Sequence, residues 1–246
     1  MVKRVLIVVL SIIILIEVCG CMSMEKKVTK KYTNEEKKEL VLAYLKDKYG
    51  EEFEGMEYKP EQLLQENDEF YLYSKSRSKK EGFQVWGATL KDGTYKMRDG
   101  YFGIMIHDEY EKVVREIVSE YYGEFKTKVM TTIDPIRPDA LNKSTKVSEI
   151  YSKLDIKTQS FYPEIWLYIK KSSTTEKDTG KTLEKISQKM VDMKLTCCVY
   201  IFVINDDQYE NVFAKDFEFN SKNLADKRKK FTIDSNLKIE KDWEAK

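Results

Sequence analysis

"RDGYFGIMIHDEYEKVVREIVSEYYGE", residues 98–124, carries the clearest structural pattern in the chain. An Asp-Gly pair turns the chain, and residues 101–106 are apolar. Apolar side chains then recur with the spacing of one helix face, at Tyr110, Val113, Val114, Ile117, Val118 and Tyr121. The spacing predicts an amphipathic helix that begins near Asp108 and ends at Gly123, with Asp108 and Glu109 complementing the helix dipole in its first turn.

A second helix is predicted upstream, over residues 34–49. Thr33 and Glu36 form a capping-box pattern at its start, and Gly50 follows its last turn. Four segments rich in aromatic and β-branched residues come next, at residues 53–59, 69–76, 82–90 and 94–98. An Asp-Gly pair at 92–93 separates the last two and is a strong hairpin signal. These segments predict an antiparallel meander with the first helix packed across one face.

The second half begins with a proline-containing connector, "TTIDPIRPDALNKS" (131–144), which we interpret as the boundary between two lobes. "SFYPEIWLYIKK" (160–171) predicts a strand. Residues 179–194 predict a helix whose inward side chains are Leu183, Ile186, Met190 and Met193. "LTCCVYIFVI" (195–204) is apolar on both faces and is therefore predicted to be a central strand. Strand, helix and strand form a crossover unit. Residues 210–219 and 229–239 are predicted to be edge strands.

These patterns predict an α+β fold. An antiparallel sheet with packed amphipathic helices is expected over residues 33–125. A smaller lobe with the strand-helix-strand unit is expected over residues 126–246.

The first thirty residues carry a targeting signal. Lys3 and Arg4 precede an apolar run at residues 5–16, and small residues follow, as in a secretory signal peptide. The run is shorter than the roughly 20 apolar residues that span a bilayer, although an uncleaved anchor helix stays open as an alternative.

The residues that end this signal, Val18-Cys19-Gly20-Cys21, resemble the lipobox of bacterial lipoproteins. The resemblance implies that the Cys21 thiol receives a diacylglycerol and that a peptidase cuts between Gly20 and Cys21. Residues 1–20 would then be the lipoprotein signal peptide and residues 21–32 a charged tether. The mature chain would be exported and held by its lipid on the outer face of the cell membrane.

Two further segments, "YL-x-x-KYGEEFE" (44–54) and "DGYFGI" (99–104), are similar to segments of small uncharacterised surface lipoproteins of Gram-positive bacteria. This resemblance covers roughly residues 40–125. It implies a fold and a location but brings no activity with it.

Composition limits the classes of function. Without residues 1–20, basic and acidic side chains are equal in number, which argues against a nucleic-acid partner. Aromatic residues make up 12% of the chain, which argues against a disordered protein. Cys197 and Cys198 are adjacent in a β-run, so their side chains point to opposite faces. We interpret them as two small buried hydrophobic residues, with a redox switch as the alternative.

Motifs for catalysis or for a cofactor are not found. His107 is the only histidine, and it is predicted at a helix N-terminus, where a structural or surface role is favoured over a catalytic one. "KDTGKT" (177–182) lacks the first glycine of a phosphate loop and is not assigned as one. No cofactor is expected.

Asp206 and Asp207 follow the predicted central strand. Two carboxylates at a strand end could hold a hard cation such as Ca²⁺ or Mg²⁺. They could equally be turn residues that cap the next segment.

An aromatic set lies in the predicted meander: Tyr71, Tyr73, Trp86 and Tyr95, with Tyr101 and Phe102 after it. Tyr71 and Tyr73 share one strand face, and Trp86 lies on a neighbouring strand. If this face is open, its rings offer a surface for a sugar, peptide or protein partner. If a helix covers it, the residues belong to the core.

The sequence therefore predicts a lipid-anchored binding or interaction module with an extracellular protein, peptide or glycan partner. The alternative is a cell-envelope hydrolase or metal-dependent enzyme that uses carboxylates near Asp206 and Asp207. A solute-binding component of a transporter is a third class, which the length of the chain disfavours.

Overall fold

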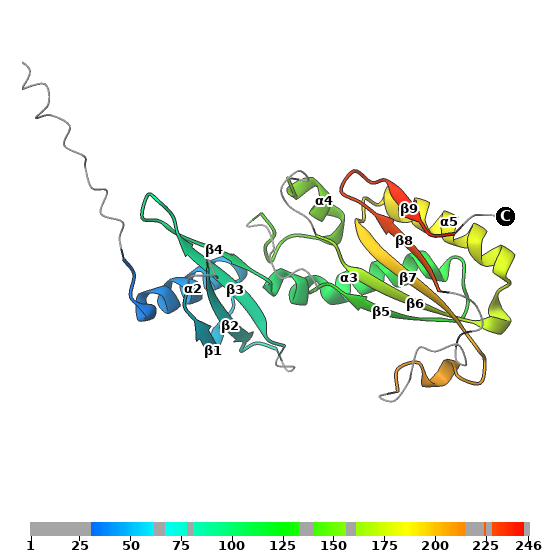
Figure 1. The fold of residues 1–246 in the computed structure, drawn as a ribbon, viewed down its shortest axis with the longest axis horizontal. Coiled ribbons are helices and arrows are strands. Elements are labelled where there is room, and N and C mark those ends of the chain that lie inside the picture. The colour runs from blue at the N-terminus through cyan, green and yellow to red at the C-terminus, as the bar shows by residue number, and fades with distance from the viewer. Residues whose placement is uncertain are drawn as a thin grey trace, which may run out of the picture.

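The strands of the protein form two sheets at the two ends of an elongated molecule, and one long helix connects them (Figure 1). The computed structural model describes residues 31–61, 67–77, 81–132, 140–155, 161–214, 224 and 228–243. Helices and mostly antiparallel strands are mixed in this part of the chain, so the predicted α+β class is confirmed.

The first sheet is the predicted antiparallel meander, with the strand order β1-β2-β3-β4. Its strands are β1 (Phe53–Lys59), β2 (Asp68–Ser74), β3 (Phe83–Thr89) and β4 (Tyr95–Asp99). The hairpin between β3 and β4 turns at Gly93, whose φ of 86° lies in the left-handed region that glycine adopts readily. The backbone N–H of Leu90 donates to the Thr94 carbonyl at 2.8 Å and closes this hairpin.

Helix α2 (Asn34–Tyr49) packs across one face of the first sheet, as predicted. Its capping box is present, because Thr33 Oγ1 accepts from the Glu36 N–H while Glu36 Oε2 accepts from the Thr33 N–H. Gly50 ends the helix in the left-handed conformation, with φ of 70°. Val41 and Leu45 are fully buried on the side that faces the strands.

Helix α3 (Tyr101–Ser119) begins seven residues earlier than predicted, so the predicted start at Asp108 is wrong. Asp99 Oδ1 accepts from the Tyr101 N–H at 3.0 Å and satisfies a donor of the first turn. The apolar side chains of residues 101–106 can then enter the core without a polar N-cap. His107 consequently lies within the helix rather than at its N-terminus.

The predicted end of this helix at Gly123 is also wrong, because α3 ends at Ser119. The N–H groups of Tyr121 and Tyr122 both donate to the Val118 carbonyl, which turns the chain early and buries the Tyr122 side chain. The first turns of α3 contact the first sheet, where the Tyr101 ring lies 4.9 Å from that of Phe53. The later turns pack on β5 of the second sheet.

The second sheet has the strand order β5-β6-β7-β8-β9. Its strands are β5 (Phe125–Met130), β6 (Glu164–Lys170), β7 (Cys197–Ile204), β8 (Lys229–Ile233) and β9 (Ile239–Lys241). β6 and β7 are parallel and are connected through α5 (Glu176–Asp192), which confirms the crossover unit, and β7 is central as predicted. This sheet has one strand more than the first and is therefore not the smaller of the two.

Cys197 and Cys198 are both free and buried, as the β-run predicted. Burial raises the pKa of each thiol above its ordinary value, and for Cys197 the neighbouring Cys198 adds to the effect. Protonated buried thiols are poor nucleophiles, so their role here is packing.

Three smaller predictions for the second half are wrong. Met193 is exposed, because α5 ends at Asp192 and the helical spacing no longer applies. Residues 210–214 are not a strand, since the buried Tyr209 ring anchors a short 3₁₀ helix, Tyr209–Asn211. The rest of that segment, 215–219, lies outside the described residues. The segment 229–239 is not an edge strand as predicted, because its strand β8 pairs with β7 on one side and β9 on the other.

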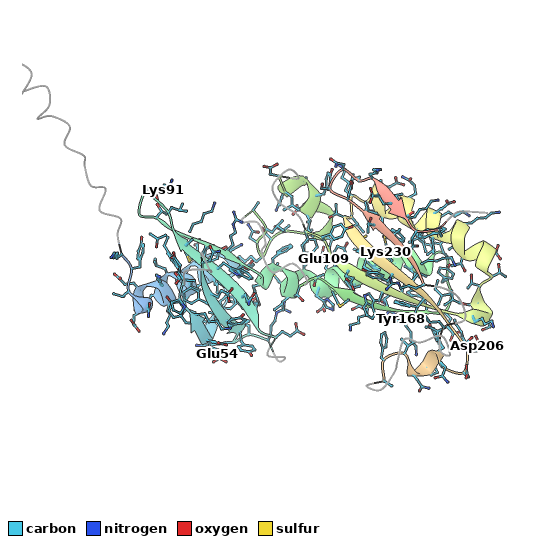
Figure 2. The ribbon with its side chains drawn as sticks, viewed as in Figure 1. Glu54, Lys91, Glu109, Tyr168, Asp206 and Lys230 are labelled. Atoms are coloured by element: carbon cyan, nitrogen blue, oxygen red, sulfur yellow. The ribbon has the colours of Figure 1, made fainter. Side chains whose placement is uncertain are left out.

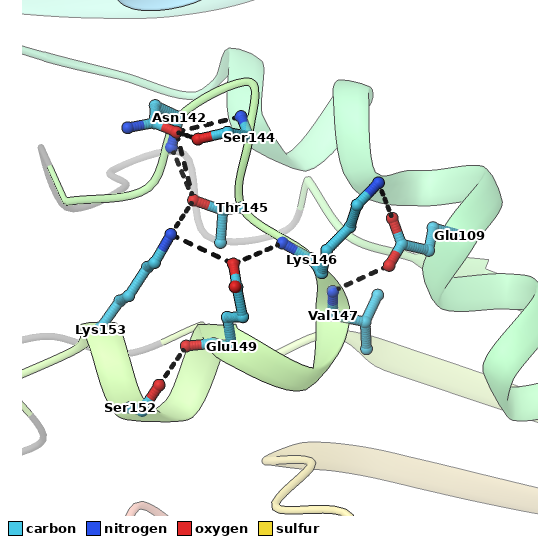
Figure 3. A network of polar contacts seen from close by, with 9 residues as sticks. All are labelled: Glu109, Asn142, Ser144, Thr145, Lys146, Val147, Glu149, Ser152 and Lys153. Atoms are coloured by element: carbon cyan, nitrogen blue, oxygen red, sulfur yellow. Dashed lines mark hydrogen bonds and ion pairs between the residues drawn. The ribbon is translucent and has the colours of Figure 1, made fainter.

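A polar network holds the residues that follow the predicted connector, together with the part of the connector that the structure describes, against α3 (Figure 3). Asn142 Oδ1 accepts from the N–H of Ser144 at 3.0 Å. Glu109 Oε1 accepts from the N–H of Val147 at 3.0 Å, at the start of a short helical segment formed by η1 (Val147–Glu149) and α4 (Ile150–Lys153). The two prolines of the connector lie outside the described residues.

Candidate functional site

Within the described residues, no helix packs on one face of the first sheet, and we call this the open face. It is formed by the side chains that point away from α2: Glu54, Glu57, Lys59, Glu69, Tyr71, Tyr73, Gln84, Trp86, Ala88, Lys96 and Arg98. Each of these side chains is half-buried or exposed. Figure 2 shows the position of Glu54 on the first sheet.

The register of the strands arranges the open face in cross-strand rows. Glu69, Trp86 and Arg98 form one row, in which the indole lies between an acid and a base. Tyr71 lies in the next row beside Gln84, whose side-chain amide donates to the Tyr71 hydroxyl. Lys59 Nζ lies 5.0 Å from the centre of the Tyr71 ring. The face is therefore an aromatic band with mixed charges around it.

Tyr95 does not share this face. Its side chain points toward α2, is 6% exposed and donates to Asp68 Oδ2 at 2.7 Å. Tyr101 and Phe102 are fully buried. The structure thus divides the predicted aromatic set into three residues on the open face, Tyr71, Tyr73 and Trp86, and a core group.

The inner face of the same sheet carries two buried carboxylates that the sequence analysis did not single out. Asp99 accepts from Lys48 Nζ at 2.7 Å, from the Tyr49 hydroxyl at 2.7 Å and from the Tyr44 hydroxyl at 2.8 Å. Burial first, and then the Asp99 charge, raises the pKa of Tyr49 far above its ordinary value. The three donors come from α2, so this carboxylate fastens the helix to β4.

Asp68 has the same arrangement on β2. Lys37 Nζ of α2 lies 2.8 Å from Asp68 Oδ2, and the hydroxyls of Tyr58 and Tyr95 donate to its two oxygens. Burial opposes ionisation of Asp68, but the bonds from Lys37, Tyr95, the Glu61 N–H and Tyr58 outweigh it and lower the pKa. Both oxygens of Asp68 therefore already accept hydrogen bonds within the protein, and the role of this carboxylate is to position α2.

A second candidate site is a groove beside α3, which we call the α3 groove. It consists of two hollows, of about 610 and 530 Å³, which meet at His107 and Glu111. The first hollow is polar and includes Arg77, Glu81 and Asp108. The second hollow reaches the second sheet and is bordered by Lys128, Trp166 and Phe213. Both volumes lie in the range of ordinary ligand sites.

His107 and Glu111 lie one helical turn apart on α3, with His107 Nε2 3.7 Å from Glu111 Oε2. His107 Nδ1 lies 3.5 Å from Thr131 Oγ1, whose hydroxyl donates to the Gly103 carbonyl at 2.7 Å. Because the hydroxyl hydrogen is used there, Thr131 accepts from His107, which places the ring proton on Nδ1. Nε2, on the other side of the ring, faces the Glu111 carboxylate.

Sequence reasoning missed this groove. Its residues come from the connection after β2, from α3, from β5 and β6, and from the turn after β7, and none forms a motif with its neighbours in the chain. Of the groove residues the sequence analysis weighed only His107 as a candidate, and Phe213 fell in a segment that was predicted to be a strand.

Asp206 and Asp207 lie in an exposed turn after β7, where Figure 2 shows Asp206 at the far end of the second sheet. Asp206 Oδ1 accepts from the Ser172 N–H at 3.0 Å, and the bonds from Ser172 together with Lys170 lower the Asp206 pKa. Asp207 accepts from the Gln208 side chain at 3.2 Å. Among the described residues, no three His, Cys, Asp or Glu side chains gather as metal ligands would.

Comparison with models of protein families, with curated proteins and with solved structures gave no match. None of the helices in the described ranges combines the length and the apolar character of a membrane span. The lipobox residues Gly20 and Cys21 lie outside the described residues, so lipidation stays a prediction.

Proposed function

We propose that the chain is a lipid-anchored protein of the outer face of the cell membrane that binds an extracellular protein through the open face. The observation that carries this proposal is the half-exposed aromatic band of Tyr71, Tyr73 and Trp86, on a sheet face that none of the helices in the described part of the chain covers.

The chemistry of the open face favours a protein partner. Tyr, Trp and Arg are enriched at protein interfaces and contribute most of their binding free energy, and the open face carries all three types. The surface is one face of a four-stranded sheet, which suits another protein or an extended peptide better than a small molecule. Three acidic and three basic side chains surround the rings, so the face has no basic excess that would attract a nucleic acid.

Helix α2 supports the same assignment by leaving this surface accessible. The tether joins the described part of the chain just before α2, and α2 covers the opposite face of the sheet. The two buried aspartates hold α2 there. A lipid anchor at Cys21 would therefore attach to the sheet through its covered side.

Membrane attachment is tested by replacing Cys21 in the full-length chain expressed in a bacterium that processes lipoproteins. Cys21→Ser should move the protein from the membrane fraction to the medium, whereas Cys19→Ser should leave it in the membrane. Mass spectrometry of the wild type should find a diacylglyceryl group on Cys21. Retention of Cys21→Ser in the membrane would instead support an uncleaved anchor helix.

Partner binding is tested with a photoreactive phenylalanine analogue at Tyr71, Tyr73 or Trp86 in intact cells. A protein adduct of one defined mass is expected from all three positions. Lys112, an exposed residue of α3, provides the control position and should give no such adduct. Equal adducts from the control position, or none from the open face, would contradict the proposal.

The hydrolase alternative has less support from the site. Asp206 is engaged by Ser172, and Asp207 by Gln208, in an exposed turn rather than in a cleft. A carboxylic acid that acts as a general acid near neutral pH needs a raised pKa, whereas the bonds from Ser172 lower the pKa of Asp206.

A further inference from the structure

We infer that the α3 groove is a second binding site, independent of the open face, and that its ligand is an uncharged saccharide. A sugar ring has apolar C–H faces and a rim of hydroxyl groups, so it needs an aromatic surface beside a set of hydrogen-bond acceptors and donors. The groove provides both, in two hollows that meet.

The aromatic end of the groove is marked by Phe213. Its side chain is 57% exposed, the highest value among the large apolar side chains of the described residues. The Phe213 ring lies 5.5 Å from that of Tyr168, edge to face, and Tyr168 is buried in the second sheet, where Figure 2 labels it. An aromatic ring held in solvent at the border of a hollow is a surface for an apolar ligand face.

The polar end of the groove offers acceptors. Within the described residues, Asp108 and Glu81 form neither a hydrogen bond nor an ion pair, and both carboxylates border the hollow. Arg77, in contrast, is already engaged, because it donates to the Tyr101 hydroxyl and to the Ile104 carbonyl at 3.2 Å each. The ligand should therefore bring O–H donors and no negative charge.

His107 and Glu111, at the centre of the groove, also favour a ligand with hydroxyl groups. His107 Nε2 and Glu111 Oε2 lie 3.7 Å apart where the two hollows meet, which is too far for a direct hydrogen bond. A ligand hydroxyl can donate to the Glu111 carboxylate, while a neighbouring hydroxyl bonds to His107 Nε2. Vicinal hydroxyl groups, which are the common feature of saccharides, match this spacing.

Charge counts against ionic ligands. Glu81, Asp108 and Glu111 carry three negative charges, and Arg77 and Lys128, with Arg115 at 4.0 Å from Glu111, carry three positive ones. The carboxylates in the polar hollow disfavour phosphates and nucleic acids there, while Lys128, whose Nζ lies 5.3 Å from the centre of the Trp166 ring, disfavours a cation on that ring. An uncharged ligand avoids both penalties.

The test is calorimetric titration of the purified full-length protein, in a detergent without a sugar head group, with cellotetraose, chitotetraose and maltotetraose. Binding of at least one tetrasaccharide is expected. Glu111→Gln should weaken it about tenfold or more, because a hydrogen bond to a charged group is lost. Phe213→Ala should weaken it about fivefold or more through the loss of the apolar contact.

Matched controls separate this site from folding and from the open face. Leu90 is also an exposed apolar residue, but it lies in the hairpin of the first sheet, away from the groove. Leu90→Ala should therefore change neither binding nor the melting temperature. Trp86→Ala should abolish the crosslinked adduct of the open face and leave the titration unchanged. Since Phe213 is exposed, Phe213→Ala should fold as the wild type does.

The inference is overturned if none of the three saccharides binds, or if Glu111→Gln and Phe213→Ala both bind as the wild type does. A lysine-rich peptide that binds in the groove when the saccharides do not would also overturn it. None of these outcomes bears on the proposal for the open face, because that proposal is tested at Tyr71, Tyr73 and Trp86.

Discussion

Replacing Asp99 with Asn tests how α2 is held on the first sheet. Asp99 is fully buried and receives four donors, from Lys48, Tyr44, Tyr49 and the Tyr101 N–H. An Asn side chain has nearly the same shape, so packing is preserved. It has no charge, and its NH₂ group would face donors where a carboxylate oxygen now accepts.

The magnitude follows from the burial of both partners. Lys48 is 6% exposed and Asp99 is 0% exposed, so neither charge can be solvated once the other is lost. Breaking a buried ion pair by removing one partner costs about 3–5 kcal/mol. For a chain of this length each kcal/mol lowers the melting temperature by about 2–4 °C, so Asp99→Asn should lower it by about 10 °C.

The assay is thermal unfolding followed by circular dichroism, with Glu52→Gln as the matched control. Glu52 pairs with Lys46 at the end of the same helix, but 65% of the Lys46 side chain and 59% of the Glu52 side chain are exposed. Such a pair contributes little, and Glu52→Gln should leave the melting temperature nearly unchanged.

A double-mutant cycle shows whether the Asp99 effect comes from the ion pair. Lys48→Met combined with Asp99→Asn should cost less than the two single changes together, because neither charge is then left alone. If Asp99→Asn unfolds at the temperature of Glu52→Gln, or if the two changes add without coupling, the account of this network is wrong.

Further predictions concern packing, acid stability and the buried thiols. A Cβ on Gly87 would lie 2.1 Å from the Tyr95 hydroxyl, so Gly87→Ala should lower the melting temperature through a clash of about 1–3 kcal/mol, whereas Gly123→Ala, which meets nothing within 4 Å, should not. The pKa of Asp68 is lowered by folding from its ordinary value of 3.8, so its contribution to stability is complete above that value and is lost as the pH falls through the folded pKa; acid titration of Asp68→Asn should show less loss of stability below pH 4 than the wild type. Burial raises the pKa of Cys197, so iodoacetamide should modify it only in denaturant, and rapid labelling of the folded protein would contradict its placement.

The elements with local signals were predictable from the sequence. Thr33, Glu36 and Gly50 specify both ends of α2 through contacts within a few residues, and the structure has the same bounds. Gly93 likewise specifies the turn between β3 and β4 through its own backbone conformation. The start of α3 was missed because its N-cap residue, Gly100, has no capping side chain, and the Asp99-Gly100 pair was interpreted as a turn.

The alternation of side chains along a strand predicted which residues share a face of the sheet, but not which face a helix covers. Tyr71, Tyr73 and Trp86 were grouped correctly, because two of them lie on one strand and the third pairs beside them. Tyr95 was grouped with them because the pairing of β4 with β3 was unknown. It lies opposite Thr89 and so points inward.

The α3 groove was not predictable, because its chemistry depends on tertiary geometry. The orientation of the His107 ring toward Glu111 depends on Thr131, which is 24 residues away and belongs to the chain after β5. Phe213 becomes a groove residue only because Tyr168, on β6, holds its ring at the border. Neither relation is a spacing in the chain. The histidine that looked isolated in the sequence is, in the folded protein, the point where a polar and an aromatic hollow meet, and from that juxtaposition we infer the preference of the groove for hydroxyl groups.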